Sequence, residues 1–139
     1  MEAITRARTN SPFLASLIER QPDLVVLLEK GAFDEALAQA LAVMVEDNPG
    51  ATLRKQRQGV ALVTAIADLA GVWDLTKVTR ILSDFADTAL DIAIAAAFAE
   101  RVPDAPVQGF AVIGLGKHGG QELNYSSDID PIFLYDPET

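Results

Sequence analysis

The chain has no cysteine among its 139 residues, so disulfides and thiolate metal sites are excluded. A reducing cytoplasm is compatible with this absence and is the location we expect. Long hydrophobic runs are also missing, since the longest, residues 92–99, follows Asp91 directly and is too short to span a bilayer. The N-terminal segment MEAITRARTNSP has no apolar core, so it does not form a secretory signal. We therefore expect no membrane partner.

Basic residues are scarce. The 11 Lys and Arg side chains stand against 20 Asp and Glu, which gives a formal net charge of −9. Proteins that bind the nucleic-acid backbone normally have a basic face, because neutralising phosphates supplies most of that affinity. The one local basic cluster, Arg54, Lys55 and Arg57, is more typical of a solvated helix face than of a binding patch. The sequence therefore predicts no nucleic-acid partner.

Residues 11–101 have the pattern of consecutive helices. Ser11 and Pro12 form an N-cap and first-turn pair, and Pro22 ends that helix because the residue before a proline disfavours the helical region. Periodicity and helix breakers predict further helices over residues 23–30, 33–46 and 52–70, and a long one from the cap Asp74 to about residue 101. The second half of this last helix is rich in alanine and isoleucine, so we expect it to be buried on most sides.

Pro103 and Pro106 mark a boundary, after which the pattern changes to short strands. The apolar run over residues 110–113, FAVI, is typical of a buried strand, and residues 132–135, IFLY, form a second one. Between them we expect the glycine-rich loop GLGKHGG, a brief helix over QEL and a turn at NYSSD. Two strands do not make a stable sheet alone. This part is therefore expected to begin a truncated α/β domain.

Asp128 and Asp130 are the strongest candidates for catalysis. They are separated by one residue at the entry to the second strand, and side chains two apart on a strand share a face, so both carboxylates can converge. Such hard oxygen ligands suit Mg²⁺, which also binds water and substrate phosphates. Two such ions can stabilise the attacking and leaving oxygens of an in-line displacement at phosphorus. The pair therefore predicts a magnesium site.

The glycine-rich segment supplies candidates for phosphate binding. Gly119 and Gly120 allow backbone N–H groups to approach phosphate oxygens, and a helix beginning there would add a favourable dipole. Ser126 and Ser127 can donate hydroxyl hydrogen bonds to the same phosphates, and Lys117 can offset their charge. An Asp-Xaa-Asp alone is too common to carry weight. A double glycine, seven residues and Asp-Xaa-Asp entering an apolar strand form a much more specific pattern.

Two other functions remain open at this point. Gly114, Gly116 and Gly119 follow a strand in the order of a dinucleotide-binding fingerprint, with Asp136 about twenty residues further on. That fold needs a crossover helix of about ten residues or more, and only residues 120–123 are available, so this hypothesis ranks lower. The other hypothesis is a helical module that docks on a large partner without catalysis.

The segment GLGKHGGQELNYSSDIDPIFLYD closely resembles the nucleotidyltransferase signature of the bifunctional glutamine synthetase adenylyltransferase/adenylyl-removing enzyme family. SPFLASLIERQPDLVVLLEKG is similar to that family's start, and LRKQRQGVALVTAIADLAGVWDLTKVTRILSDFADTAL to the segment before its signature. The family carries the signature twice, and this copy resembles the first, in the half that removes AMP. The implied fold class is α+β, with a helical region over residues 1–106 and the incomplete start of a nucleotidyltransferase-type α/β domain over residues 107–139.

The resemblance also implies a reaction and partners. Inorganic phosphate would attack the AMP–tyrosine linkage on glutamine synthetase and release ADP, while the other half would adenylylate from ATP under control of the PII signal protein and glutamine. Asp128 and Asp130 would be metal ligands, completed by a third carboxylate from a later strand. Gly119, Gly120 and Ser127 would hold phosphate.

One residue departs from the family pattern, and a few others have simpler interpretations. Pro131 replaces an aliphatic residue, and it either shifts the strand start by one residue or weakens this copy of the site. His118, the only histidine, is expected at the surface rather than in catalysis. Trp73 is expected to pack in the core, and for Tyr125 packing is favoured over stacking on adenine. Lys117 is as compatible with a solvated loop as with phosphate.

Overall fold

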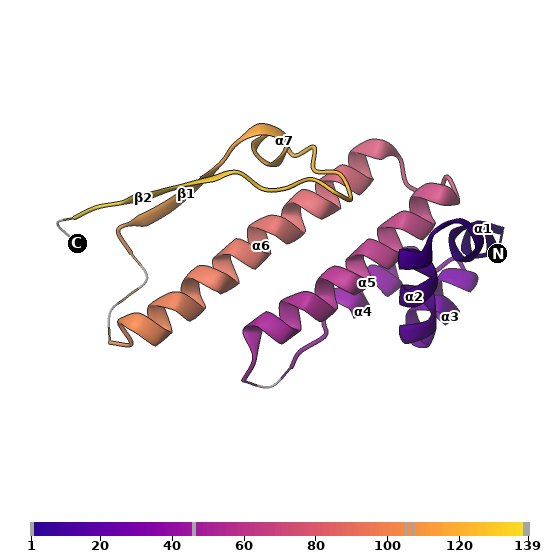
Figure 1. The fold of residues 1–139 in the computed structure, drawn as a ribbon, viewed down its shortest axis with the longest axis horizontal. Coiled ribbons are helices and arrows are strands. Elements are labelled where there is room, and N and C mark those ends of the chain that lie inside the picture. Colours follow the sequence, from indigo (N-terminus) through magenta and orange to yellow (C-terminus); the bar gives the residue numbers. More distant parts are fainter. Residues whose placement is uncertain (1, 46, 105, 107, 138–139) are drawn as a thin grey trace.

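The computed structural model describes residues 2–45, 47–104, 106 and 108–137. Figure 1 shows short helices gathered against one long helix, a second long helix beside it, and a β-hairpin along the second. The elements in chain order are α1 (Glu2–Asn10), α2 (Pro12–Arg20), α3 (Pro22–Glu29), α4 (Phe33–Leu41), α5 (Pro49–Leu69), α6 (Leu75–Arg101), β1 (Phe110–Gly114), α7 (Gly116–Gly119) and β2 (Pro131–Tyr135). This is an α+β arrangement. The predicted boundary between residues 106 and 107 stays a prediction, and Val107 lies outside the described residues.

Two predicted helix starts are confirmed by their caps. The Ser11 hydroxyl accepts a hydrogen bond from the Leu14 N–H (3.2 Å) at the start of α2. The Asp74 carboxylate accepts one from the Lys77 N–H (2.8 Å) at the start of α6. These side chains satisfy N–H groups that have no partner inside the helix, so the local sequence fixes where both helices begin.

The end of α4 differs from the prediction. The apolar pattern continues to Glu46, which lies outside the described residues, but α4 already ends at Leu41. The amide Nε2 of Gln56, on α5, donates to the carbonyl oxygens of Leu41 (2.7 Å) and Val43 (3.0 Å). A side chain distant in sequence thus satisfies carbonyls that a longer helix would use itself, and the chain leaves the helix there.

Two further helix starts differ. The helix α1 was not predicted, although Ala3, Ile4 and Ala7 form a buried stripe along it. The helix α5 begins at Pro49 rather than near residue 52, because the Asn48 side chain accepts a hydrogen bond from the Ala51 N–H (2.9 Å). The sequence Asn-Pro-Gly therefore starts a helix as well as ending the preceding segment.

The main core lies between the short helices and α5. Trp73 is 5 % exposed and packs against Phe33, with ring centroids 6.1 Å apart, which confirms its predicted packing role. At Gly59, an added Cβ would lie 2.7 Å from the Cβ of Ala40, so the missing side chain lets α4 and α5 approach closely. The largest fully buried side chains include Leu28, Leu62, Ile66, Val60, Val63 and Val78.

The second half of α6 is not buried on most sides, contrary to the prediction. Only Val78 and Ser83 are buried along this helix, and both belong to its first half. The second half contacts the hairpin through Phe98, which meets Phe110 edge-on at 6.1 Å, and the remaining face stays open within the described residues. Among the described helices, none combines the length and apolar composition needed to cross a membrane.

The two predicted strands are confirmed, and they pair antiparallel. Phe110 lies opposite Tyr135 and Gly114 opposite Pro131. The strand β2 therefore starts at Pro131, one residue early, where the missing N–H of proline is tolerated. The strand β1 alternates between half-buried and exposed residues, so it is not the fully buried strand predicted. Antiparallel pairing also contradicts the dinucleotide-binding hypothesis, which requires parallel strands joined by a crossover helix.

Candidate functional site

The glycine-rich segment forms a single helical turn packed against the end of β1. The helix α7 spans Gly116–Gly119, and Gly116 has φ of 57°, a left-handed conformation that favours glycine. A Cβ at Gly119 would collide with the carbonyl oxygen of Gly114, so a glycine is needed there for the close approach. The brief helix predicted over QEL is wrong, because Gln121 has φ of 59° and residues 121–123 lie outside any helix.

The paired glycines lie at the C-terminal end of α7. The N–H of Gly119 donates to the Leu115 carbonyl (3.2 Å), and the N–H of Gly120 donates to the Gly116 carbonyl (3.0 Å). The expectation that a helix begins at these glycines and directs its positive dipole end at a phosphate is therefore wrong. Gly120 has φ of −82°, and a Cβ there would meet nothing closer than 3.4 Å. The fold itself does not require glycine at position 120.

His118 anchors α7 to the long helix α6. Its ring is 3 % exposed, and Nε2 lies 2.7 Å from Oδ1 of Asp87. The prediction of a surface histidine is wrong, because the imidazole covers Gly114, where an added Cβ would lie 3.0 Å from Nδ1. Gln121 donates from Nε2 to the other carboxylate oxygen of Asp87 at 3.4 Å. The Asp87 carboxylate thus binds His118 within α7 and Gln121 just after it.

The segment after α7 is bonded to both long helices. The N–H of Leu123, whose side chain is buried, donates to the Ser83 hydroxyl of α6 (3.3 Å). The Tyr125 hydroxyl donates to the Asp68 carboxylate of α5 (3.3 Å). Partial burial, followed by the charge of Asp68 and this hydrogen bond, raises the pKa of the Tyr125 hydroxyl above the usual tyrosine range. The hydrogen bond therefore ties Tyr125 to α5, while the residue stays 42 % exposed, and its packing role stays a prediction.

Asn124 organises the predicted turn at NYSSD. Its side-chain oxygen accepts hydrogen bonds from the Ser126 N–H (3.1 Å) and the Ser127 hydroxyl (2.9 Å). The N–H of Asn124 in turn donates to the Ser127 hydroxyl oxygen (3.3 Å). This Asx-type turn fixes the chain immediately before Asp128. The hydroxyl hydrogen of Ser127 must rotate away from Asn124 before it can donate to a phosphate.

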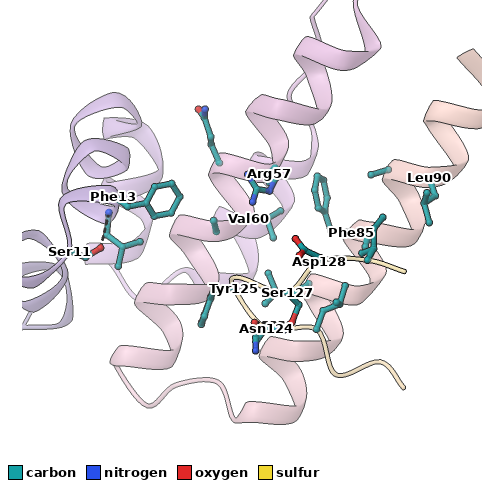
Figure 2. A pocket seen from close by; sticks show the side chains of 18 residues that line it. Ser11, Phe13, Arg57, Val60, Phe85, Leu90, Asn124, Tyr125, Ser127 and Asp128 are labelled. Atoms are coloured by element: carbon teal, nitrogen blue, oxygen red, sulfur yellow. Dashed lines mark hydrogen bonds between the residues drawn. The ribbon is translucent and has the colours of Figure 1, made fainter. Parts of the chain in front are cut away.

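A cleft of about 710 Å³ opens beside this turn. Figure 2 shows Arg57 on α5, Phe85 on α6 and Asp128 on the turn segment around the same space. Its lining comes from four parts of the chain: Ser11, Phe13 and Leu14 near α2; Arg57, Gln58, Val60 and Ala61 of α5; Leu82, Phe85, Ala86, Ala89 and Leu90 of α6; and Leu123, Asn124, Tyr125, Ser127, Asp128 and Ile129. The walls are mainly apolar, and most of the polar residues come from α5 and the turn segment.

The cleft contains some of the predicted site residues and not others. Ser127 and Asp128 line it. The remaining candidates do not: Asp130, Gly119, Gly120, Ser126 and Lys117. The convergence of both carboxylates on one point stays a prediction. Asp130 is nevertheless held at the end of the hairpin, because its carbonyl accepts the Leu115 N–H at 3.1 Å.

The two carboxylates suit a hard divalent cation. Both side chains are exposed, and neither makes a hydrogen bond or ion pair within the described residues. Mg²⁺ is commonly held by one or two carboxylates together with waters and substrate phosphates. The described part of the chain brings no group of three potential His, Cys, Asp or Glu ligands together, and the third carboxylate stays a prediction.

Sequence reasoning missed the residues that brace the turn. Ser83 and Asp87 lie four positions apart and therefore share one face of α6, but polar residues on a helix usually face solvent. Their role becomes visible only when α7 is placed against them. Arg57 was assigned to a solvated face. It is exposed, yet its side chain lines the cleft that also contains Asp128.

Comparisons with known proteins agree on one family. The model of the glutamate-ammonia ligase adenylyltransferase family matches residues 1–139. A bifunctional glutamine synthetase adenylyltransferase/adenylyl-removing enzyme of Caulobacter vibrioides is 38% identical over 92% of the chain, and relatives of the same name from Rhodopseudomonas palustris and Neisseria meningitidis serogroup B are 34% and 36% identical over 91% of it. The chain spans about 15% of the length of the first two relatives and 16% of the third. No solved structure matches it significantly.

Proposed function

Since the chain belongs to the glutamate-ammonia ligase adenylyltransferase family, we propose that it forms part of a metal-dependent nucleotidyltransferase acting on a tyrosine of glutamine synthetase. One observation carries the proposal: the acidic pair of the signature follows a turn braced on both long helices, and the first carboxylate lines a cleft. The proposed reaction is removal of AMP. Because the chain spans a small share of its relatives' length, we further propose that it is inactive alone.

In the proposed reaction, an oxygen of inorganic phosphate attacks the phosphorus of the AMP–tyrosine linkage. The new P–O bond forms ADP, the bond to the tyrosine oxygen breaks, and that oxygen takes a proton. Asp128 and Asp130 would hold the metal, which supplies Lewis-acid stabilisation of the charge on the oxygens at phosphorus. Ser127 would donate to a phosphate oxygen, and Lys117 would offset negative charge. Gly119 and Gly120 would leave space for phosphate beside the backbone.

The proposal extends to partners and location. Glutamine synthetase is the protein substrate, ATP, ADP and phosphate are the small-molecule ligands, and the PII signal protein is the regulator. A cytoplasmic location agrees with the absence of cysteine. A helical docking module without catalysis is the second candidate, because the large half-exposed surface of α6 is available within the described residues.

The test measures ADP release from adenylylated glutamine synthetase by the full-length protein. We expect release to require both phosphate and Mg²⁺. The variants Asp128→Asn and Asp130→Asn should each reduce the rate by about a hundredfold or more, since they remove a metal-binding charge. The variant Asp91→Asn is the matched control, because Asp91 is an exposed carboxylate of α6 that does not line the cleft. Full activity in both site variants would reject catalysis here and leave the docking module.

A further inference from the structure

The cleft beside the turn contains one cation and one anion among its lining side chains. Arg57 comes from α5 and Asp128 from the turn segment, and every other residue of the lining is uncharged in its ordinary state. The Arg57 side chain makes no ion pair or hydrogen bond within the described residues. A guanidinium has five N–H donors in a planar fork that matches phosphate oxygens. An unpaired arginine beside a metal-binding carboxylate therefore suits a phosphate group that also touches the metal.

Most of the remaining cleft lining is apolar. The helix α6 contributes an apolar wall that includes Leu82, Phe85 and Ala89, and Val60 and Ala61 of α5 continue it. Phe13 of α2, which is 57 % exposed, extends the apolar surface on another side. Planar bases bury their faces well against aromatic and aliphatic side chains. The combination of an apolar wall with one cation in the lining fits a nucleoside monophosphate.

The volume agrees with such a ligand. Sites for small molecules and cofactors commonly measure about 300–1,000 Å³. The cleft has about 710 Å³, which is enough for a nucleotide together with part of the group to which it is attached. Asn124, Ser127 and Asp128 belong to one turn segment and all three line the cleft, so this segment supplies polar groups for the phosphate.

We propose that this cleft binds the AMP moiety, with the adenosine against the apolar wall of α6 and the phosphate between Arg57 and the metal site at Asp128. The inference rests on the proposed function and deepens it, because it assigns recognition of the nucleotide to the helical region. Arg57 is then a substrate-binding residue. The basic cluster at residues 54–57 has one member in the site and two outside it.

The test compares AMP with adenosine, using the full-length protein and calorimetric titration in the presence of Mg²⁺. We expect Arg57→Ala to weaken AMP binding by about tenfold or more, since charge-assisted hydrogen bonds to a phosphate are lost. Adenosine binding should not change in this variant. Phe85→Ala should weaken both ligands. Arg54→Ala is the matched control, because Arg54 is an exposed arginine of the same helix that does not line the cleft, and its AMP affinity should equal that of the wild type.

Photolabelling gives a second measurement that does not depend on a variant. An 8-azidoadenosine monophosphate probe should label α6 or α2, and an excess of AMP should prevent the labelling. Unchanged AMP affinity in Arg57→Ala, or labelling confined to other segments, overturns the inference. These outcomes leave the proposed function intact if Asp128→Asn still abolishes ADP release. Conversely, Arg57-dependent AMP binding without any phosphorolysis supports the cleft and rejects the proposed reaction.

Discussion

Nε2 of His118 lies 2.7 Å from Oδ1 of Asp87, although 31 positions separate the two residues in the sequence. The contact joins the glycine-rich turn to the long helix α6. It buries the imidazole almost completely while the Asp87 carboxylate stays about half exposed. The turn is therefore held by the helical region as well as by the hairpin.

This pair predicts a coupled loss of stability. Asp87→Ala should lower the free energy of unfolding by about 1–3 kcal/mol, because it leaves the buried Nε2 of His118 without its hydrogen-bond partner. His118→Ala should have an effect of similar size, because it removes a buried ring together with the same hydrogen bond. The double variant should lose less than the sum of the two, as expected for residues in direct contact. Denaturant unfolding measures all three. Asp84→Ala, an exposed residue of the same helix, is the control, and additive effects would contradict the pairing.

The two adjacent glycines should respond differently to the same substitution. Gly119→Ala should destabilise the fold by about 1–3 kcal/mol, since its Cβ would collide with the Gly114 carbonyl oxygen. Gly120→Ala should leave the melting temperature nearly unchanged, because its Cβ meets only ordinary contacts. If Gly120 leaves space for phosphate, Gly120→Ala should still slow ADP release. A fully active Gly120→Ala enzyme would remove this glycine from the proposed site.

The raised pKa of Tyr125 predicts that the stability of the fold depends on pH in the alkaline range. Its pKa is raised, so the folded state favours the protonated hydroxyl. The stabilisation is fully present below about pH 10, where tyrosine ionises in the unfolded chain. It is lost as pH rises further, until the folded hydroxyl also ionises. Tyr135→Phe leaves Tyr125 as the sole tyrosine of this chain. The absorbance near 295 nm then reports ionisation of the Tyr125 hydroxyl, which should occur above the usual pH range of tyrosine. Asp68→Asn should lower that pKa.

The hydrogen bonds of the Gln56 side chain predict that this residue determines where α4 ends. Gln56→Ala removes two hydrogen bonds to the carbonyls of Leu41 and Val43 and should lower the free energy of unfolding by about 1–3 kcal/mol. Amide hydrogen exchange should accelerate around residues 41–45 at the same time. Gln58→Ala, on the same helix without these bonds, is the control for stability. Equal exchange in both variants would show that another feature ends α4.

The sequence predicts those parts of the fold that depend on neighbouring residues. Ser11 and Asp74 cap their helices through the next three residues, and the two apolar runs become strands because their patterns are local. The end of α4 could not be predicted, because it depends on Gln56, 15 positions from Leu41. The exposure of the second half of α6 depends likewise on what packs against it. Composition alone does not contain that information.

In the candidate site, too, the residues that belong to a local motif were predicted, and those that depend on tertiary packing were not. Asp128 and Ser127 were predicted from a motif and do line a cleft. His118 was predicted at the surface because a lone histidine in a glycine-rich loop offers no local partner, and Asp87 becomes one only through tertiary packing. The four-residue helix α7 was missed for a related reason, since its glycines favour a loop and packing on Gly114 and α6 stabilises the turn.

The segment between α7 and β2 carries a mechanical consequence. Its Leu123 is bonded to Ser83 of one long helix and its Tyr125 to Asp68 of the other. A change in the angle between α5 and α6 must therefore either move this segment together with the neighbouring Asp128 or break one of the two hydrogen bonds. A movement at the far ends of the two helices would thus be transmitted through these hydrogen bonds to the acidic residue that lines the cleft.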